Sequence, residues 1–170
     1  MTPTAAPDGA GDLAAQETVR TATPADLDDV VALAAAAVAE KQTQKGGAVW
    51  VRRESRPEPF ARSLGETLRA SHHEVAVGQL DGVTVGYGVV HSETLLDGGK
   101  LGVIDDIYVD PRARELGLGE LLMEHLLAWC REQGCFGVDS LALPGDRSTK
   151  NFFESFGLVA RAIVVHRPLE

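Results

Sequence analysis

The sequence predicts a mixed α/β fold, in which about four helices flank one sheet of antiparallel and parallel strands. Residues 100–129 change from alternating apolar positions to helical spacing, so a strand there leads directly into a helix. Asp81-Gly82 joins two strand-like runs and is typical of a tight hairpin turn. A further strand-like run, 136–143, follows the helix, and a right-handed crossover places it parallel to the strand before the helix.

Length and composition are typical of a single globular domain. The chain has 170 residues, of which 44% are hydrophobic and 24% charged. No apolar run reaches the roughly 20 residues of a membrane span, and the N-terminus has no secretory signal pattern. A net charge of −9 argues against a general nucleic-acid binder. We expect a cytoplasmic protein in which Cys130 and Cys135 are free thiols.

The N-terminal part begins with residues 1–16, which are rich in Ala, Gly, Pro and Thr. We expect them to be a disordered leader before one domain over 17–170. Residues 17–22 alternate weakly and predict a first strand. A helix should follow and run to about Lys41, with Thr23 as its N-cap.

The next segment, 48–59, gives no clear assignment, because its prolines forbid a continuous helix. A second helix is expected over 60–70. The His72-His73 pair that follows is not predicted to bind a metal, since neighbouring histidines point apart on a strand and no third ligand is nearby in the sequence. No metal is therefore expected in this protein.

Three antiparallel strands are expected before the central helix. They cover 74–80, 83–90 and 103–109, joined by turns at 81–82 and 96–99. In the second strand Gly86 and Gly88 leave room for the close approach of another backbone.

The third of these strands is the element around which the rest of the chain is organised. Strict alternation places Val103, Ile107 and Val109 on one face together with Asp105, and Asp106 on the other. At most one of these two carboxylates then faces a given cleft, unless a bulge intervenes.

The turn between this strand and the helix, 111–119, is a predicted anion-binding site. A helix that begins near Gly117 leaves about four backbone N–H groups without internal partners, at the positive end of the helix dipole. Gly117 and Gly119 have no side chains, so an anion can approach the backbone, and Arg112 and Arg114 add positive charge. The spacing matches neither GxGxxG nor the P-loop, so a pyrophosphate is expected in a different kind of cradle.

The central helix should end at Gly134, a plausible C′ glycine. Three more elements complete the predicted fold: a parallel strand, a helix and a last strand, over 136–143, 146–156 and 158–166.

A resemblance to the GCN5-related N-acetyltransferase (GNAT) family rests on two segments. The first reads Val109-x-Pro111-x-x-Arg114-x-x-Gly117-x-Gly119 and resembles the family motif R/Q-x-x-G-x-G/A, which binds the pyrophosphate of acetyl-CoA. The second, TKNFFESFGL over 149–158, resembles the family's terminal helix. The order of elements agrees over 18–166. One departure is Glu115, which stands where the family usually has a glycine.

The resemblance implies the GNAT acyl-CoA N-acyltransferase fold, in which the last antiparallel strand and its parallel neighbour splay apart. It implies that the pantetheine arm of acetyl-CoA pairs with the main chain of Ile107, Tyr108 and Val109. Lys150 would lie near the CoA phosphates, with a solvated charge at the start of a helix as the alternative, and Phe153 would lie against the pantetheine. The implied pyrophosphate site consists of Arg114, Glu115, Leu116, Gly117, Leu118 and Gly119.

The catalytic residues are less well indicated. Asp105 is the candidate general base, acting through a water, because some family members have a carboxylate at this strand position; a solvated or ion-paired carboxylate is the alternative. His91 is a second candidate base. The tyrosine that commonly serves the family as general acid is Phe153 here, so Tyr108 is the substitute candidate, with a structural core tyrosine as the alternative.

The predicted function is acetyl-CoA-dependent N-acetylation of a primary amine on an unidentified small molecule or peptide, without a metal, nucleic acid or membrane partner. Three alternatives stay open: a CoA-binding regulatory module that has lost catalysis, as Phe153 suggests, a transferase that uses a longer acyl-CoA, and a nucleotide-binding interaction protein. A homodimer is compatible with the sequence. The acceptor would be selected by the first two helices, by the segment 42–59 and by the chain around the last strand.

Overall fold

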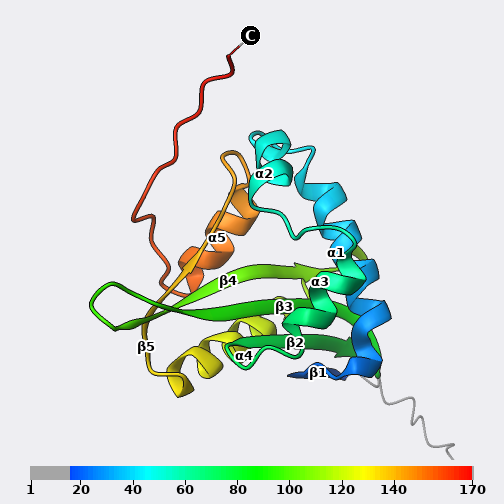
Figure 1. Ribbon diagram of the computed structural model, residues 1–170. Helices are drawn as coiled ribbons and strands as arrows, with labels where there is room; N and C mark the ends of the chain where they lie inside the picture. The colour runs from blue at the N-terminus through cyan, green and yellow to red at the C-terminus, as the bar shows by residue number, and fades with distance from the viewer. Residues whose placement is uncertain (1–15, 170) are drawn as a thin grey trace, which may run out of the picture.

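The computed structural model describes residues 16–169, which form one five-stranded sheet with helices on both faces (Figure 1). The strands lie in chain order, antiparallel from β1 to β4, and β5 is parallel to β4. This confirms the predicted mixed sheet. The strands are β1 (Glu17–Thr21), β2 (His73–Leu80), β3 (Val83–Thr94), β4 (Lys100–Val109) and β5 (Cys135–Ser140). Except for residue 16, the predicted leader lies outside the described residues.

Two buried clusters lie on opposite faces of the sheet. One cluster joins α1 and α3 to the sheet through Val30, Leu64 and Val89, and the other joins α4 and α5 to it through Leu122 and Phe153. The helices are α1 (Leu27–Lys41), α2 (Gly47–Arg53), α3 (Phe60–Thr67), α4 (Leu118–Glu132) and α5 (Arg147–Ser155), with short 3-10 turns η1 (Pro24–Asp26) and η2 (Pro111–Ala113). None of the described helices is both long enough and apolar enough to cross a bilayer.

Several predicted local signals have their expected geometry. At the start of the first helical segment the backbone N–H of Thr23 donates to the Asp26 carboxylate over 2.7 Å. Asp81 and Gly82 have φ of 48° and 81°, and both positive values are what a two-residue hairpin turn requires. Gly134, with φ of 75°, follows the C-cap of α4.

The close approach predicted at the glycines of β3 is present. A Cβ at Gly86 would lie 3.1 Å from the carbonyl oxygen of Tyr108, on the neighbouring strand. A Cβ at Gly88 would lie 2.9 Å from Leu126, so at this position the close neighbour is a side chain of α4 rather than a backbone.

Two segments differ from the sequence prediction. The unassigned stretch 48–59 contains most of α2 and then an irregular segment that leads to α3. The last strand predicted over 158–166 is absent, and after α5 the chain runs away from the sheet (Figure 1). A strand needs the backbone hydrogen bonds of a neighbour, and no described strand pairs with this segment. That prediction is therefore wrong.

Candidate active site

The parallel pair at the edge of the sheet, β4 and β5, separates partway along its length. The parallel pairing of β4 with β5 begins at Lys100 and Cys135 and stops at Ile104 and Ser140. Residues 105–109 of β4 consequently have no strand partner on that side among the described residues. This is the splayed pair that the resemblance to the GNAT family implies, and it leaves main-chain groups of β4 available to a ligand.

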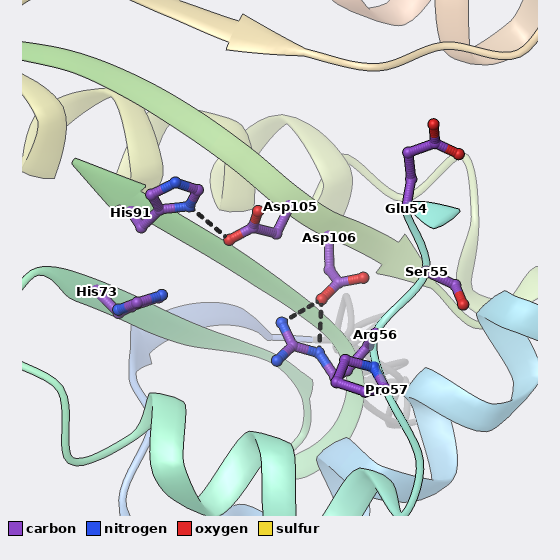
Figure 2. A pocket seen from close by; sticks show the side chains of 8 residues that line it. All are labelled: Glu54, Ser55, Arg56, Pro57, His73, His91, Asp105 and Asp106. Atoms are coloured by element: carbon purple, nitrogen blue, oxygen red, sulfur yellow. Dashed lines mark hydrogen bonds and ion pairs between the residues drawn. The ribbon is translucent and has the colours of Figure 1, made fainter. Parts of the chain in front are cut away.

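A bulge in β4 lies at the point where the strands separate. In the pairing with β3, Asp106 opposes Val89 and Ile104 opposes Val90, so Asp105 is the extra residue. Because of this bulge, Asp105 and Asp106 line the same pocket, as Figure 2 shows. Ile107, in contrast, packs with the α4 cluster. The prediction that Asp105 and Ile107 share one face of the strand is therefore wrong, because strict alternation does not hold across a bulge.

The pocket lies on the face of the sheet that carries α1 and α3, and its cavity volume is about 220 Å³. One wall comes from strands β2, β3 and β4, and the other from the segment between α2 and α3 (Figure 2). The lining residues are Glu54, Ser55, Arg56, Pro57, His73, His91, Asp105 and Asp106.

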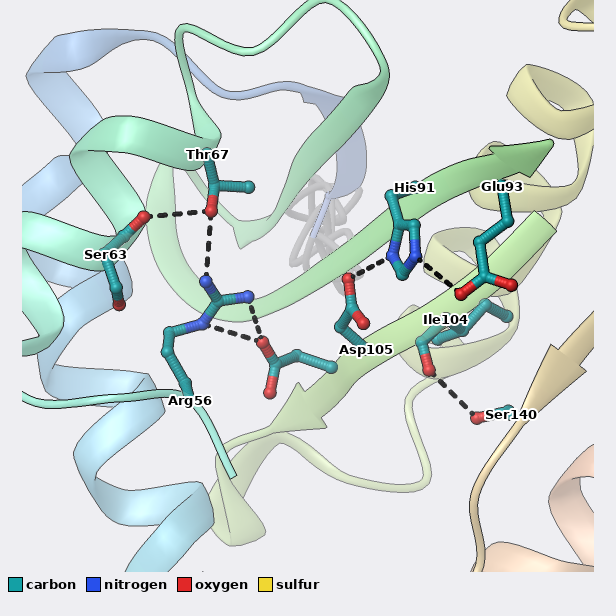
Figure 3. Close-up of polar contacts among 9 residues, drawn as sticks. Arg56, Ser63, Thr67, His91, Glu93, Ile104, Asp105 and Ser140 are labelled. Atoms are coloured by element: carbon teal, nitrogen blue, oxygen red, sulfur yellow. Dashed lines mark hydrogen bonds and ion pairs between the residues drawn. The ribbon is translucent and has the colours of Figure 1, made fainter. Parts of the chain in front are cut away.

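Asp105 forms a hydrogen-bonded pair with His91 from the neighbouring strand (Figure 3). The His91 Nδ1 lies 2.8 Å from Asp105 Oδ2, and on the other side of the ring Nε2 lies 3.4 Å from Glu93. The hydrogen bond that the Asp105 carboxylate accepts from the ring is the main cause that raises the pKa of His91 above its ordinary value, against the opposing effect of burial. The pair is thus an acid–base group at the edge of the pocket.

His73 lies beside this pair. Its ring centroid is 5.3 Å from that of His91 and 4.3 Å from that of His72. His73, His91 and Asp105 each offer a potential metal-ligand atom, and these atoms lie within 4.8 Å of one another. The argument that His73 has no further ligand nearby is therefore wrong.

We nevertheless interpret these three residues as an acid–base group rather than a metal site, since a direct hydrogen bond already joins Asp105 to His91. Burial is the main cause that lowers the pKa of His73, which favours the neutral form of this ring. Its Nδ1 is buried without a hydrogen-bond partner, whereas a metal-bound histidine ordinarily uses its second nitrogen in such a bond.

Asp106 forms an ion pair with an arginine, whereas Asp105 is hydrogen-bonded to a histidine. Arg56 donates to its Oδ2 from Nε over 3.0 Å and from Nη2 over 2.6 Å, and the two side chains are only 9% and 14% exposed. Arg56 also donates to Thr67 Oγ1 over 3.1 Å, which ties the segment after α2 to α3 (Figure 3). The sequence does not indicate the role of Arg56, because no local pattern shows which arginine among Arg52, Arg53 and Arg56 points toward the sheet.

The turn after β4 begins a helix whose N-terminus has no side-chain cap. Gly117 is the N-cap residue, with φ of 86°, and the first helical bond runs from Leu121 N–H to Gly117 O over 3.1 Å. The N–H groups of the three residues before Leu121 therefore have no helical acceptor. A Cβ at Gly119 would meet Phe152 at 3.5 Å, an ordinary contact, so the fold itself has room for a side chain there.

The cations predicted near a phosphate ligand each have a carboxylate partner in this structure. Arg114 donates to Glu40 of α1 over 2.7 Å and to the carbonyl oxygen of Val109 over 2.9 Å. Arg112 pairs with Asp110, and Lys150 with Glu154 over 2.5 Å. An incoming phosphate would compete with these carboxylates.

The remaining predicted site residues divide between core and surface. Tyr108 packs at the edge of the α1 cluster under the guanidinium of Arg114, and burial raises its pKa. It does not line the pocket. Phe153 is 7% exposed within the α4 cluster, against which Ile107 and Val109 also pack. Glu115 and Leu116 lie exposed in the turn, and Leu118 is buried as the first residue of α4.

Comparisons with known proteins identify the family and the fold. A model of the Acetyltransferase (GNAT) family matches residues 28–158. Glucosamine 6-phosphate N-acetyltransferase of Arabidopsis thaliana is 32% identical over 75 residues, which cover 44% of this chain and 48% of that protein. The chain thus matches about half the length of this curated relative.

Solved structures share the fold over nearly the whole chain. The crystal structure of glucosamine-6-phosphate N-acetyltransferase from Arabidopsis thaliana has a TM-score of 0.67 at 24% identity, covering 91% of this chain and 99% of that one. Aminoglycoside N-acetyltransferase AAC(6')-Iy in complex with CoA has a TM-score of 0.71 at 16% identity, covering 93% and 98%.

Proposed function

The chain belongs to the GNAT family of acetyltransferases, and from this membership we propose that it transfers the acetyl group of acetyl-CoA to a primary amine held beside Asp105. One observation carries the proposal. The bulge in β4 brings the Asp105/His91 pair next to the unpaired edge of the same strand. A group that can accept a proton therefore adjoins the backbone that would hold the acyl donor.

The donor, acetyl-CoA, occupies the split between β4 and β5 in this proposal. Its pantetheine arm pairs with the free main chain of residues 107–109, and its pyrophosphate accepts from the uncapped N–H groups at the start of α4. Arg112 and Arg114 exchange their carboxylate partners for phosphate oxygens, so binding should weaken as ionic strength rises.

The acceptor is a small primary amine or the amine end of a larger molecule. A cavity of about 220 Å³ is below the ~300–1,000 Å³ that encloses a whole drug-sized ligand. Glu54, Asp105 and Asp106 contribute three carboxylates against the single guanidinium of Arg56, which favours a cation. The curated relative is named for glucosamine 6-phosphate, which belongs among the amines to test.

The proposed chemistry begins with removal of a proton. Alkyl amines resemble the lysine side chain, whose pKa is about 10.4, so most of the amine is protonated at neutral pH. Neutral His91 accepts this proton, and the Asp105 carboxylate stabilises the imidazolium that forms. Asp106 has Arg56 as its partner, so we assign it a positioning role for the segment after α2.

Acyl transfer then follows without an added reagent. The amine nitrogen forms a bond to the thioester carbon while a main-chain N–H of residues 107–109 donates to the carbonyl oxygen. The carbon–sulfur bond breaks, and the imidazolium returns its proton through water to the departing CoA thiolate. The second proton that the nitrogen loses on becoming an amide is released to water. This route needs no tyrosine at Phe153, and it explains how catalysis can proceed with that position in the core.

The test is an assay of CoA thiol release with acetyl-CoA and a panel of polyamines, amino acids, aminoglycosides, peptide N-termini and glucosamine 6-phosphate. We expect turnover with at least one amine and a roughly 10²-fold loss of kcat in Asp105→Asn. Asp28→Asn, a matched change at an exposed position of α1, should keep the wild-type rate. Equal rates in the two variants would contradict the role of Asp105.

The second candidate is a CoA-binding regulatory module, which Phe153 favours because it lacks the hydroxyl of the family's usual acid. In that case CoA raises the melting temperature but no amine releases thiol. The same assay with longer acyl-CoA donors determines the acyl chain length. We also infer a cytoplasmic location, supported by the free thiols of Cys130 and Cys135.

A further inference from the structure

A second cavity lies where α1, α2 and α3 meet, and its volume is about 390 Å³. Val38 of α1, Val51 of α2 and Phe60 of α3 each contribute to its wall. The segment between α2 and α3 lines it as well, and residues 55–57 of this segment also line the pocket beside Asp105 (Figure 2). The two cavities are therefore neighbours that share one part of their walls.

The charges that line the second cavity are opposite in sign to those that line the pocket. Its wall contains the guanidinium groups of Arg52, Arg53 and Arg56, and the single carboxylate of Glu58. The pocket beside Asp105, in contrast, has three carboxylates and one guanidinium. Because the whole chain has a net charge of −9, a positive cavity is a local feature of this segment and not a general property of the surface. The charge favours an anionic ligand.

Two of these three arginines are available to a ligand. Arg56 is not, because it is already paired with the half-buried carboxylate of Asp106. Arg53 lies 3.3 Å from Glu54, but its side chain is 70% exposed, so this contact contributes little in water. Arg52 has no ion pair or side-chain hydrogen bond within the part of the chain that the structure describes. A guanidinium presents paired N–H donors that match the two oxygens of a carboxylate.

Much of the remaining wall is apolar. Val38, Val51 and Phe60 are only half-buried, so their side chains leave hydrocarbon surface open to the cavity. A volume of about 390 Å³ lies within the ~300–1,000 Å³ that encloses a small organic ligand. A bare inorganic anion would leave this apolar surface in water, whereas an anion attached to an aromatic or branched hydrocarbon would bury it.

We propose that this cavity is a binding site for a small organic anion with an aromatic or branched apolar part. Arg52 and Arg53 hold the charged group, and the three helices supply the contacts to the hydrocarbon. The site is separate from the pocket in which we place the amine. A ligand here restrains residues 55–57, and with them the arginine that pairs with Asp106, so occupation of the second cavity is coupled to the shape of the first.

The proposal is tested with phenylpropionate, a carboxylate on an aromatic chain, titrated into the full chain and followed by heteronuclear NMR. We expect saturable shifts of backbone amide signals that are concentrated in residues 51–60. Phenylpropanamide has nearly the same shape without the charge and should bind about tenfold more weakly. Neither acetyl-CoA nor an amine is present, so the readout does not depend on acetyl transfer.

Two variants locate the ligand in this cavity. Arg52→Gln with Arg53→Gln removes the positive charge and should weaken binding of phenylpropionate by about tenfold or more. The matched control, Arg62→Gln with Arg69→Gln, makes the same change in net charge at two exposed arginines that do not line the cavity, and it should bind as the wild type does. Val51→Phe fills part of the cavity without changing its charge and should also weaken binding.

Three results would overturn the proposal. The first is no binding of phenylpropionate up to about 10 mM, the weak end of the affinities expected for a ligand of this size. The second is equal affinity for the carboxylate and the amide. The third is a variant of the two cavity arginines that binds as tightly as the control variant. The substituted arginines are exposed, so both double variants should stay folded, and circular dichroism checks this.

Discussion

The turn after β4 and the pocket beside Asp105 lie at the same strand but are built from different groups. The turn offers the backbone N–H groups of one short segment, and its key positions are glycines. The pocket offers side chains from four separate segments, held by ion pairs and hydrogen bonds. This difference predicts that substitutions in the turn act by occupying space, whereas those in the pocket act by removing charge.

The largest effect should come from Gly119→Val. An added side chain would occupy the space in which a pyrophosphate approaches the first turn of α4. Losing two hydrogen bonds to a charged group would weaken CoA binding by roughly 10³-fold. Isothermal titration of CoA measures this loss, and Gly119→Ala should give a smaller one. An unchanged affinity in the valine variant would place the phosphates elsewhere.

The fold should tolerate this change, because the added Cβ meets Phe152 at 3.5 Å and Val109 at 4.0 Å, which are ordinary contacts. The circular dichroism spectrum of Gly119→Val should therefore match that of the wild type. Retained folding distinguishes this variant of the turn from variants of the pocket that destabilise the protein.

In the pocket, Arg56→Met should destabilise the fold itself. The change leaves the Asp106 carboxylate 14% exposed and without its guanidinium, and breaking such a pair from one side costs about 3 kcal/mol. Chemical denaturation measures the free energy of unfolding. The double variant Arg56→Met with Asp106→Asn should regain much of the loss, because no unpaired charge remains. If the double variant is no more stable than the single one, the ion pair is not the cause.

The third effect concerns the pH dependence of kcat/KM. His91 can accept a proton only when neutral, and its pKa is raised, so the rate should increase with pH through a midpoint above 6.5. Asp105→Asn removes the main cause of that increase in pKa and should move the midpoint to lower pH. His91→Asn should abolish this limb and lower kcat/KM by roughly 10²-fold. A midpoint that stays in place in Asp105→Asn would show that another group titrates.

The turn could be predicted from the sequence because its signals are contiguous. The apolar period changes from strand to helix within a few residues, and Gly117 and Gly119 stand at the change. The hairpin of β2 and β3 was predictable for the same reason, since Asp81-Gly82 specifies its turn by itself. Where the backbone needs a special conformation, the residue type at that position indicates it directly.

The pocket could not be predicted, because it depends on two bulges. The hairpin turn alone would pair His73 with Val90, and an irregularity between Gly78 and Gln79 shifts the partner to His91. The bulge at Asp105 then turns a second carboxylate to the same face. Hydrophobic patterns do not encode such single-residue shifts.

In the C-terminal segment the sequence predicts a strand that does not form. Residues 158–166 have the composition of a strand, but composition does not determine pairing, and none of the described strands pairs with this segment.

The smallest predicted effect concerns Glu115 in the turn. It distinguishes the energetic cost of the backbone conformation from that of the carboxylate charge. Glu115 has φ of 69°, a left-handed conformation that costs a non-glycine residue about 1–2 kcal/mol. The GNAT family usually has glycine at this position, and the strain gives a physical reason for that preference. Glu115→Gly relieves the strain but adds freedom to the unfolded chain, so we expect a net gain of about 0.5–1 kcal/mol in the free energy of unfolding. Glu115→Gln keeps the strain and removes only the charge, so it should leave stability unchanged while CoA binds slightly more tightly at low salt. Chemical denaturation and CoA titration of both variants measure the two contributions. If the glutamine variant were stabilised as much as the glycine variant, repulsion by the carboxylate rather than backbone strain would be the cost at this position.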